Sequence, residues 1–158
     1  MINNEELRKF INIADKPHAD GTAEINREPD HSSTIVFDSG DWKMHDNFFG
    51  GEPYGGRQVV YYKDQPVWFC AYYGKITDSK LDVRLVYDFL RKSLRQAPVN
   101  GFSRGPKSFV ADEFEYRNKA TGSLETFSGH ESILYKGVEV YWADYLGGVV
   151  DIHARGEY

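Results

Sequence analysis

The chain has 158 residues, a net charge of −5 and an aromatic share of 15%. This length is enough for one domain with a hydrophobic core, so we expect a single domain over residues 1–158. The negative charge, without a basic stripe, argues against nucleic-acid binding, because that binding depends on Lys and Arg neutralising phosphates.

The sequence also lacks the marks of a membrane or secreted protein. No apolar run approaches the length of a membrane span, and "MINNEELRKF" at the N-terminus has no signal-peptide pattern. We therefore expect no membrane partner and a cytoplasmic location. The single cysteine, Cys70, cannot form an internal disulfide, which suits a reducing compartment. It lies in the apolar run "VWFCAYY", which predicts a buried, unreactive thiol.

The first predicted element is a helix near the N-terminus. Asn3 can cap it, and Leu7, Phe10, Ile11 and Ala14 mark one apolar face at helical spacing. The segment that follows, "KPHADGTAEINREPDHSS", is polar and carries turn residues. It predicts a long, mobile loop.

Four strand patterns come next. "STIVFD" and "DWKMHDNFF" are separated by "SGD", which is typical of a tight hairpin. "RQVVYY" and "VWFCAYYG" are separated by "KDQP". The pattern predicts an antiparallel meander after the first helix.

The second half of the chain repeats this order. Ser79 and Asp82 form an S-x-x-D helix start, and an apolar stripe follows at Val83, Val86, Tyr87, Leu90 and Leu94. The strand patterns "KSFV", "EFEYRN", "TFSGHESILY" and "VEVYWADYLGG" come after it.

Two segments match closely enough to predict an internal duplication. "YKDQPVWFCAYYGKI" starts at Tyr62 and "YKGVEVYWADYLGGV" starts at Tyr135, and their shared residues keep a constant offset of 73. We expect repeats over approximately residues 1–78 and 79–151. The predicted fold class is α+β, in which two copies of helix plus antiparallel β-meander form one curved sheet with the helices on one face.

A glycine-rich stretch, "FFGGEPYGG", raises a question of its own. Aligning the repeats gives the first copy five additional residues, roughly "PYGGR", which predicts either a wide turn or bulge or a ligand-contacting loop. In the second case Tyr54 and Arg57 would be the recognising side chains. A phosphate loop fits poorly, because the glycines lie between strands and no Lys-Ser or Lys-Thr follows.

The segment "FFGGEPYGGRQVVYYKDQPVWFCAYYG", with "FSRGPKSF" and "FEYRN" further on, resembles an uncharacterised bacterial domain family. The resemblance runs from about Trp42 to Val150, and its most specific part is residues 52–74. Members of that family occur alone or behind a helix-turn-helix domain, which implies a sensor or partner role without supplying a mechanism. This chain has no helix-turn-helix, and Cys70 stands where relatives often have a longer apolar residue.

Aromatic residues alternate in the central strand patterns. Alternation sets Trp68, Cys70 and Tyr72 on one face, and the repeat aligns Tyr141 and Tyr145 with two of them. Each repeat thus has two aromatic residues that flank a small one. This pattern predicts either the floor of a cleft between the units or a surface on which a helix packs.

Catalytic and metal-binding patterns are weak. His45, Asp46, His130 and Glu131 occupy corresponding parts of the repeats and could converge on a metal, but surface or turn positions explain them better. We expect no metal site and no cofactor. A carboxylate pair of Glu52 and Glu131 could serve as acid and base only if both lay in one cleft, so enzymatic activity stays uncertain.

The favoured function is a small-molecule or peptide-binding domain of regulatory or accessory type, with its site between the duplicated units. The alternative is a protein-interaction module resembling an antitoxin or immunity protein, and the third hypothesis is a small hydrolase. The partner is accordingly a small molecule or another protein. The predicted ligand-binding residues are Glu52, Tyr54, Arg57, Trp68, Tyr72, Glu131, Tyr141 and Tyr145.

Overall fold

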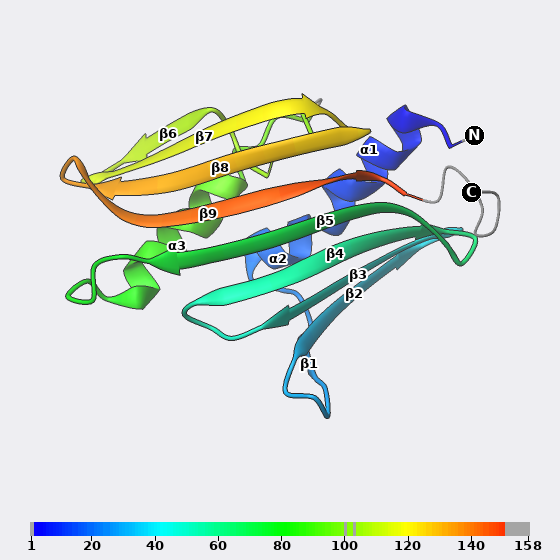
Figure 1. Ribbon diagram of the computed structural model, residues 1–158, viewed down its shortest axis with the longest axis horizontal. Coiled ribbons are helices and arrows are strands. Elements are labelled where there is room, and N and C mark those ends of the chain that lie inside the picture. Colours follow the sequence, from blue (N-terminus) through cyan, green and yellow to red (C-terminus); the bar gives the residue numbers. More distant parts are fainter. Residues whose placement is uncertain (1, 100, 103, 151–158) are drawn as a thin grey trace, which may run out of the picture.

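The computed structural model describes residues 2–99, 101–102 and 104–150, and its elements are shown in Figure 1. The helices are α1 (Asn4–Ala14), α2 (Lys16–Asp20) and α3 (Val83–Leu94). The first strands are β1 (Asn26–Arg27), β2 (Ser33–Ser39), β3 (Trp42–Phe49), β4 (Tyr54–Tyr62) and β5 (Gln65–Ile76). The later strands are β6 (Ser108–Ala111), β7 (Phe114–Ser123), β8 (Thr126–Tyr135) and β9 (Val138–Val149). Asp151, the end of the second expected repeat, lies outside the described residues.

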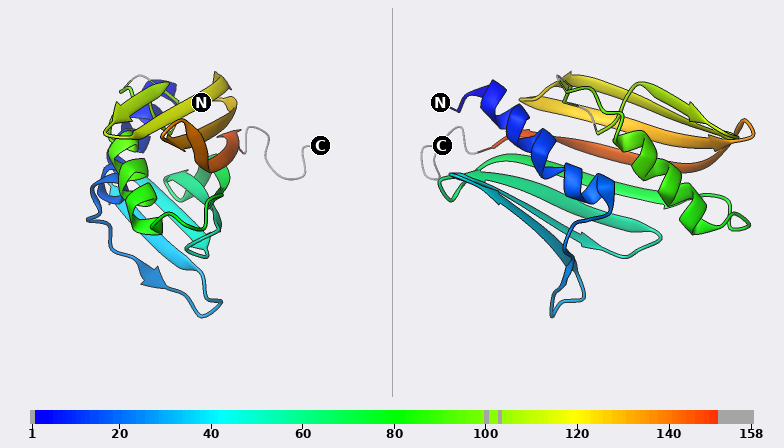
Figure 2. Two further views of the ribbon diagram at one scale, coloured as in Figure 1. Left: turned by 90° about the vertical axis from the view of Figure 1, so that its left-hand side faces the viewer. Right: turned by 180° about the vertical axis from the view of Figure 1, so that it is seen from behind.

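The strands form one curved, antiparallel sheet in the order β1-β2-β3-β4-β5-β9-β8-β7-β6. Helices α1 and α3 lie across the same face of this sheet, as the side and rear views show (Figure 2). The expected α+β class with helices on one face is confirmed. None of the described helices has the length and apolarity that crossing a membrane requires.

Both long helices pack as their patterns predict, but α3 begins later than the S-x-x-D pattern indicates, with Asp82 and not Ser79 as its cap. The Asn3 side chain accepts a hydrogen bond from Glu5 N, and Asp82 accepts one from Arg84 N, so each helix has an N-cap. Leu7 and Phe10 of α1 pack with residues of β2 to β5, whereas Val86 and Phe89 of α3 pack over β7 to β9. The sheet therefore has two apolar clusters, one under each helix.

Two loop predictions were wrong. The polar segment after α1 contains the short helix α2, which ends at Gly21 with φ 71°, and the edge strand β1. The stretch at Tyr54–Arg57, predicted to be either a wide turn or bulge or a ligand-contacting loop, is the start of β4, paired to β3 and β5. Glycine fits this strand because a Cβ on Gly56 would come within 2.7 Å of the Tyr72 hydroxyl. The glycines here make room for a crossing aromatic ring.

The two central hairpins share a register. Val60 pairs with Trp68 in β4–β5, and Ile133 pairs with Tyr141 in β8–β9, with an irregularity directly after Val60 and after Ile133. Ile133 and Tyr141 of the second hairpin stand 73 residues after Val60 and Trp68 of the first, which is the offset found in the sequence. At the centre of the sheet, β5 pairs with β9 so that Tyr72 lies opposite Tyr145.

We predict that Gly129→Ala lowers the free energy of unfolding by about 1–3 kcal/mol through overpacking. The added Cβ would lie 2.0 Å from the Tyr145 ring. That ring cannot move aside easily, because it is 2% exposed and its hydroxyl donates to Asn118 at 2.9 Å. Urea denaturation measures the change.

Gly51→Ala is the matched control, because nothing lies within 4 Å of its Cβ position and its φ is not positive. The two variants should differ clearly in their denaturation midpoints. Equal midpoints would show that Tyr145 does not constrain position 129.

Candidate functional site

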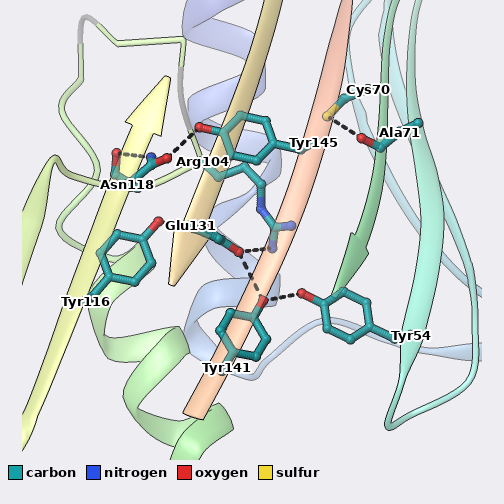
Figure 3. A network of polar contacts seen from close by, with 10 residues as sticks. Tyr54, Cys70, Ala71, Arg104, Tyr116, Asn118, Glu131, Tyr141 and Tyr145 are labelled. Carbon is teal, nitrogen blue, oxygen red and sulfur yellow. Dashed lines mark hydrogen bonds and ion pairs between the residues drawn. The ribbon is translucent and has the colours of Figure 1, made fainter. Parts of the chain in front are cut away.

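A polar network lies between the helices and the sheet (Figure 3). Its centre is Arg104, in the connection between α3 and β6, and four residues of the sheet complete it: Tyr54, Tyr116, Glu131 and Tyr141. We call these five residues the Arg104 network. Buried polar groups of this kind are expensive unless each is satisfied. The network is therefore the strongest candidate for a functional site.

The connection that carries Arg104 is fastened to β7. Asn118 Nδ2 donates to the Gly105 carbonyl at 3.3 Å, and Asn118 N donates to the Lys107 carbonyl at 3.0 Å. Gly105 is required there, since a Cβ would lie 2.4 Å from the Tyr116 hydroxyl. These contacts hold the backbone close to the sheet and let the arginine reach under the helices.

Glu131 is fully buried and is the counter-charge of Arg104. Its carboxylate accepts hydrogen bonds from Tyr116 at 2.7 Å and from Tyr141 at 3.1 Å. Arg104 Nη2 lies 3.5 Å from Glu131 Oε1. Two hydroxyls and one cation thus offset the cost of burying this charge. The 3.5 Å separation is long for a charge-assisted hydrogen bond, so the guanidinium is not tightly bound by its counter-charge.

The other terminal nitrogen of Arg104 has no such partner. Within the described part of the chain, Nη1 is buried and meets no hydrogen-bond acceptor. The guanidinium carbon lies 5.3 Å from the centre of the Tyr72 ring, so the cation rests against an aromatic face. An aromatic face attracts the charge but does not replace a hydrogen-bond acceptor for an N–H group.

Two carboxyls from the first half of the chain are influenced by the charge of this arginine. Asp46 of β3 accepts a hydrogen bond from the Tyr72 hydroxyl, and Asp15, between α1 and α2, accepts one from Gln58 at 2.5 Å. Burial raises the pKa of each carboxyl to about 6, against the hydrogen bond it accepts and the charge of Arg104. Asp15 is exposed to solvent, whereas Asp46 is half-buried.

The tyrosines of the site remain protonated at neutral pH. Burial raises the pKa of Tyr54 and of Tyr141, and the Glu131 charge raises both further, while Arg104 opposes these shifts. They act as hydrogen-bond donors: Tyr141 donates to Glu131, which leaves Tyr54 to donate to Tyr141. Burial also raises the pKa of the Cys70 thiol to about 12, so this buried cysteine is an unreactive one, as its sequence context indicates.

Five predicted site residues gather around Arg104: Tyr54, Tyr72, Glu131, Tyr141 and Tyr145. Three others do not. Trp68 is buried and donates its indole N–H to Leu124 O at 3.1 Å. Arg57 is exposed and lies on the face of β4 opposite to Tyr54, because successive residues of a strand alternate. Glu52, in the β3–β4 loop, accepts from Ile76 N at 2.7 Å and from the Tyr87 hydroxyl.

Sequence reasoning missed Arg104, Asp15 and Asn118. Arg104 lies in an irregular connection, where no periodicity shows which side chains turn inward. When the sequence repeats are aligned, Asn118 of "EFEYRN" matches Asn47. In the structure its counterpart is instead Asp46 of β3, because Asp46 accepts a hydrogen bond from Tyr72 just as Asn118 accepts one from Tyr145. The sequence match of Tyr72 with Tyr145 was therefore the signal that could have pointed to Asn118 and Asp46.

The face of the sheet away from the helices carries a separate open depression of about 540 Å³. Tyr73, His130 and Leu146 line it, and His130 Nδ1 lies 2.6 Å from Asp144 Oδ1. In residues 2–99, 101–102 and 104–150, no three His, Cys, Asp or Glu side chains form a group suited to a metal ion. His45 and Asp46 are consecutive in β3 and point to opposite faces.

Comparison with known proteins gives one match. A family model described as a domain of unknown function, DUF5680, matches residues 46–150, which is most of the chain. This agrees with the resemblance to an uncharacterised domain family. No curated protein matches the chain. No solved structure matches it either.

We predict that Arg104→Met lowers the free energy of unfolding at neutral pH by about 3–5 kcal/mol, because it leaves the buried Glu131 carboxylate without a cation. The loss of unfolding free energy should be near the lower end of this range, because the Arg104 side chain is 22% exposed. Tyr116 and Tyr141 also still donate to Glu131 in the variant. Urea denaturation at pH 7.5 measures it.

The double variant Arg104→Met/Glu131→Gln is the matched test. A neutral amide oxygen can still accept from both tyrosines, so the second change should restore most of the lost stability. A double variant no more stable than Arg104→Met would show that the two charges are not coupled.

We predict that Asp46→Asn becomes progressively more stable than the wild type as pH rises. The pKa of Asp46 is about 6 in the folded protein and has its ordinary value of 3.8 in the unfolded chain. The folded state therefore holds the proton longer, and wild-type stability falls between about pH 4 and pH 6. Asparagine does not ionise, yet it keeps an oxygen that can accept from Tyr72.

Urea denaturation of both proteins from pH 4 to pH 8 tests this. The difference in stability should be small at pH 4, grow through pH 5–6 and level off above pH 7. A difference that stays constant across this range would mean that Asp46 has an unshifted pKa.

Proposed function

We propose that this chain, which belongs to the DUF5680 family of domains of unknown function, binds a small molecule or peptide at the Arg104 network. The observation that carries the proposal is the buried Nη1 of Arg104, which meets no acceptor among the described residues. Leaving a buried donor unsatisfied costs about 1–3 kcal/mol, and more for a charged group. A ligand oxygen at this nitrogen would remove that cost.

Stability alone does not account for the network. An apolar core of equal volume is often as stable as a buried ion pair or more so. Here four tyrosine hydroxyls, from Tyr54, Tyr72, Tyr116 and Tyr141, lie on one side of the sheet with Arg104 and Glu131. Binding sites commonly combine aromatic walls with a few fixed polar groups in this way.

The site draws on both halves of the chain. Tyr54 and Tyr72 come from the first meander, whereas Arg104, Glu131 and Tyr141 come from the second half. We propose that the halves are copies of one unit. The shared register supports this, as does the pairing of Asp46 with Gln58 and of Asn118 with Glu131, beside the equivalent tyrosines Tyr72 and Tyr145. The ligand would then lie between the two units.

A regulatory or accessory role in the cytoplasm fits this proposal. It rests on the resemblance to domains that occur alone or behind helix-turn-helix domains, in which a ligand-binding module would act as a sensor. Tyrosines that remain protonated and a cysteine whose pKa is raised to about 12 supply no obvious nucleophile. These features favour binding over catalysis.

A second candidate is a protein-interaction module, and the face away from the helices favours it. Tyr73 is 47% exposed and Leu146 is 59% exposed beside the open depression on that face. Exposed aromatic and apolar residues of this kind suit a protein partner. Changing Tyr73 and Leu146 to Ser would remove partner binding while leaving any ligand at Arg104 in place. The hydrolase hypothesis requires Glu52 and Glu131 to act together as acid and base. In the structure each carboxylate has separate hydrogen-bond donors, Ile76 N for Glu52 and the Tyr116 hydroxyl for Glu131, so this hypothesis is not favoured.

Native mass spectrometry of the protein purified without denaturant tests the proposed function. We predict that the wild type retains a ligand and that Arg104→Lys loses it or binds it at least tenfold more weakly. Lysine keeps the charge beside Glu131 but lacks the planar fork of donors. Arg57→Lys is the matched control, because Arg57 lies on the opposite face, and it should retain the ligand.

Equal ligand retention by the wild type and Arg104→Lys would contradict the proposed site. Loss of the ligand from Arg57→Lys alone would move the site to the other face of the sheet. Circular dichroism melting curves establish that each variant is folded.

A further inference from the structure

We infer that the ligand is a small zwitterion, an α-amino acid or a short peptide, whose anionic group binds Arg104 and whose cationic group binds Asp46 and Asp15. This inference rests on the proposed function and concerns the same site. It follows from which groups around Arg104 are left without a partner of opposite charge.

The anion position is at the guanidinium. Arg104 Nη2 is 3.5 Å from Glu131 Oε1, and Nη1 has no acceptor among the described groups. The planar fork of an arginine matches a carboxylate, which can accept from two N–H groups at once. Glu131 cannot move to supply both acceptors without leaving Tyr116 and Tyr141. A second carboxylate, from outside the chain, would complete the coordination of this cation.

The cation position is at the two aspartates. In the described part of the chain, Asp46 and Asp15 accept from the neutral side chains of Tyr72 and Gln58, and neither forms an ion pair with Lys or Arg. Gln58 connects the two carboxyls, because it pairs with Asp46 across β3 and β4 and donates to Asp15 at 2.5 Å. A ligand ammonium group between them would supply the missing positive charge.

Tyr72 joins the two positions. Its ring faces the Arg104 guanidinium at 5.3 Å, and its hydroxyl donates to Asp46, so the charges lie on either side of one tyrosine. Two positions that adjoin one side chain suit a small ligand whose carboxylate and ammonium groups are only a few bonds apart, as they are in an amino acid. Tyr54, whose ring centre is 6.0 Å from that of Tyr72, adds a second aromatic wall.

Ligands with a single charge fit less well. A plain carboxylate at Arg104 would leave Asp46 and Asp15 with neutral donors alone, and a plain amine at the aspartates would leave Arg104 Nη1 without an acceptor. Each case leaves one charged group of the site unsatisfied, at a cost to affinity. A zwitterion satisfies both ends.

Calorimetric titration with matched probes tests the inference. The panel contains the twenty L-α-amino acids and Gly-Gly, and for each amino acid that binds, its des-amino carboxylic acid and its decarboxylated amine. We expect at least one zwitterion to bind, and removal of either charge to weaken binding at least tenfold. Asp46→Asn should weaken the zwitterion tenfold or more and leave the affinity for the des-amino acid unchanged or higher.

The inference is overturned if no member of the panel binds, if a des-amino acid or an amine binds as tightly as its parent, or if Asp46→Asn has no effect. The proposed function is judged separately, by retention of a co-purified ligand that depends on Arg104. Retention together with a failed panel would leave the site standing with a ligand of other chemistry. Failure of both measurements would remove the site altogether.

Discussion

The candidate site depends on one ion pair beneath the helices, that of Arg104 with the fully buried Glu131. Glu131 is at the centre of β8 with no exposed surface, so its charge must be satisfied inside the protein. Tyr116 and Tyr141 donate to it from the two neighbouring strands, and Arg104 enters from the α3–β6 connection. This pair links a loop, three strands and, through Tyr54, the other half of the sheet.

The pairing is asymmetric in a way that bears on function. Glu131 has two hydrogen-bond donors and a cation, whereas Arg104 has a distant carboxylate, the Tyr54 hydroxyl, the Tyr72 ring and, among the described residues, an Nη1 without an acceptor. The chain therefore satisfies its buried anion more completely than its buried cation. In the first half of the chain the imbalance is reversed, because Asp46 and Asp15 accept hydrogen bonds from the neutral side chains of Tyr72 and Gln58. Both imbalances face the same region beneath the helices.

Periodicity predicted the parts of the fold that repeat. The stripes in α1 and α3 and the alternation in β5 and β9 identified the helices, the hairpins and the tyrosines that gather at the site, because burial on one face imposes a period on the sequence. The residues of the second central hairpin, "TFSGHESILY" and "VEVYWADYLGG", match β8 and the greater part of β9. The pairing of β5 with β9, in which Tyr72 lies opposite Tyr145, was not predicted, because the sequence pattern shows the strands but not which of them are neighbours.

The errors have a physical cause too. The glycines at 55 and 56 resemble a loop by composition, but in β4 they leave space for the Tyr72 and Tyr73 side chains from β5, which is information about a neighbouring strand. The segment containing α2 is polar because that short helix buries no residue. Arg104 could not be found from pattern, since its inward direction is set by Asn118 holding the backbone of its connection.

The central claim is that Arg104 Nη1 is reserved for a ligand. A high-resolution crystal structure of the protein purified without denaturant tests this most directly. The account predicts a non-protein oxygen within hydrogen-bond distance of Nη1, and a ligand that extends past Tyr72 toward Asp46. A structure in which Nη1 donates to a group of the chain itself, or only to water, would contradict it.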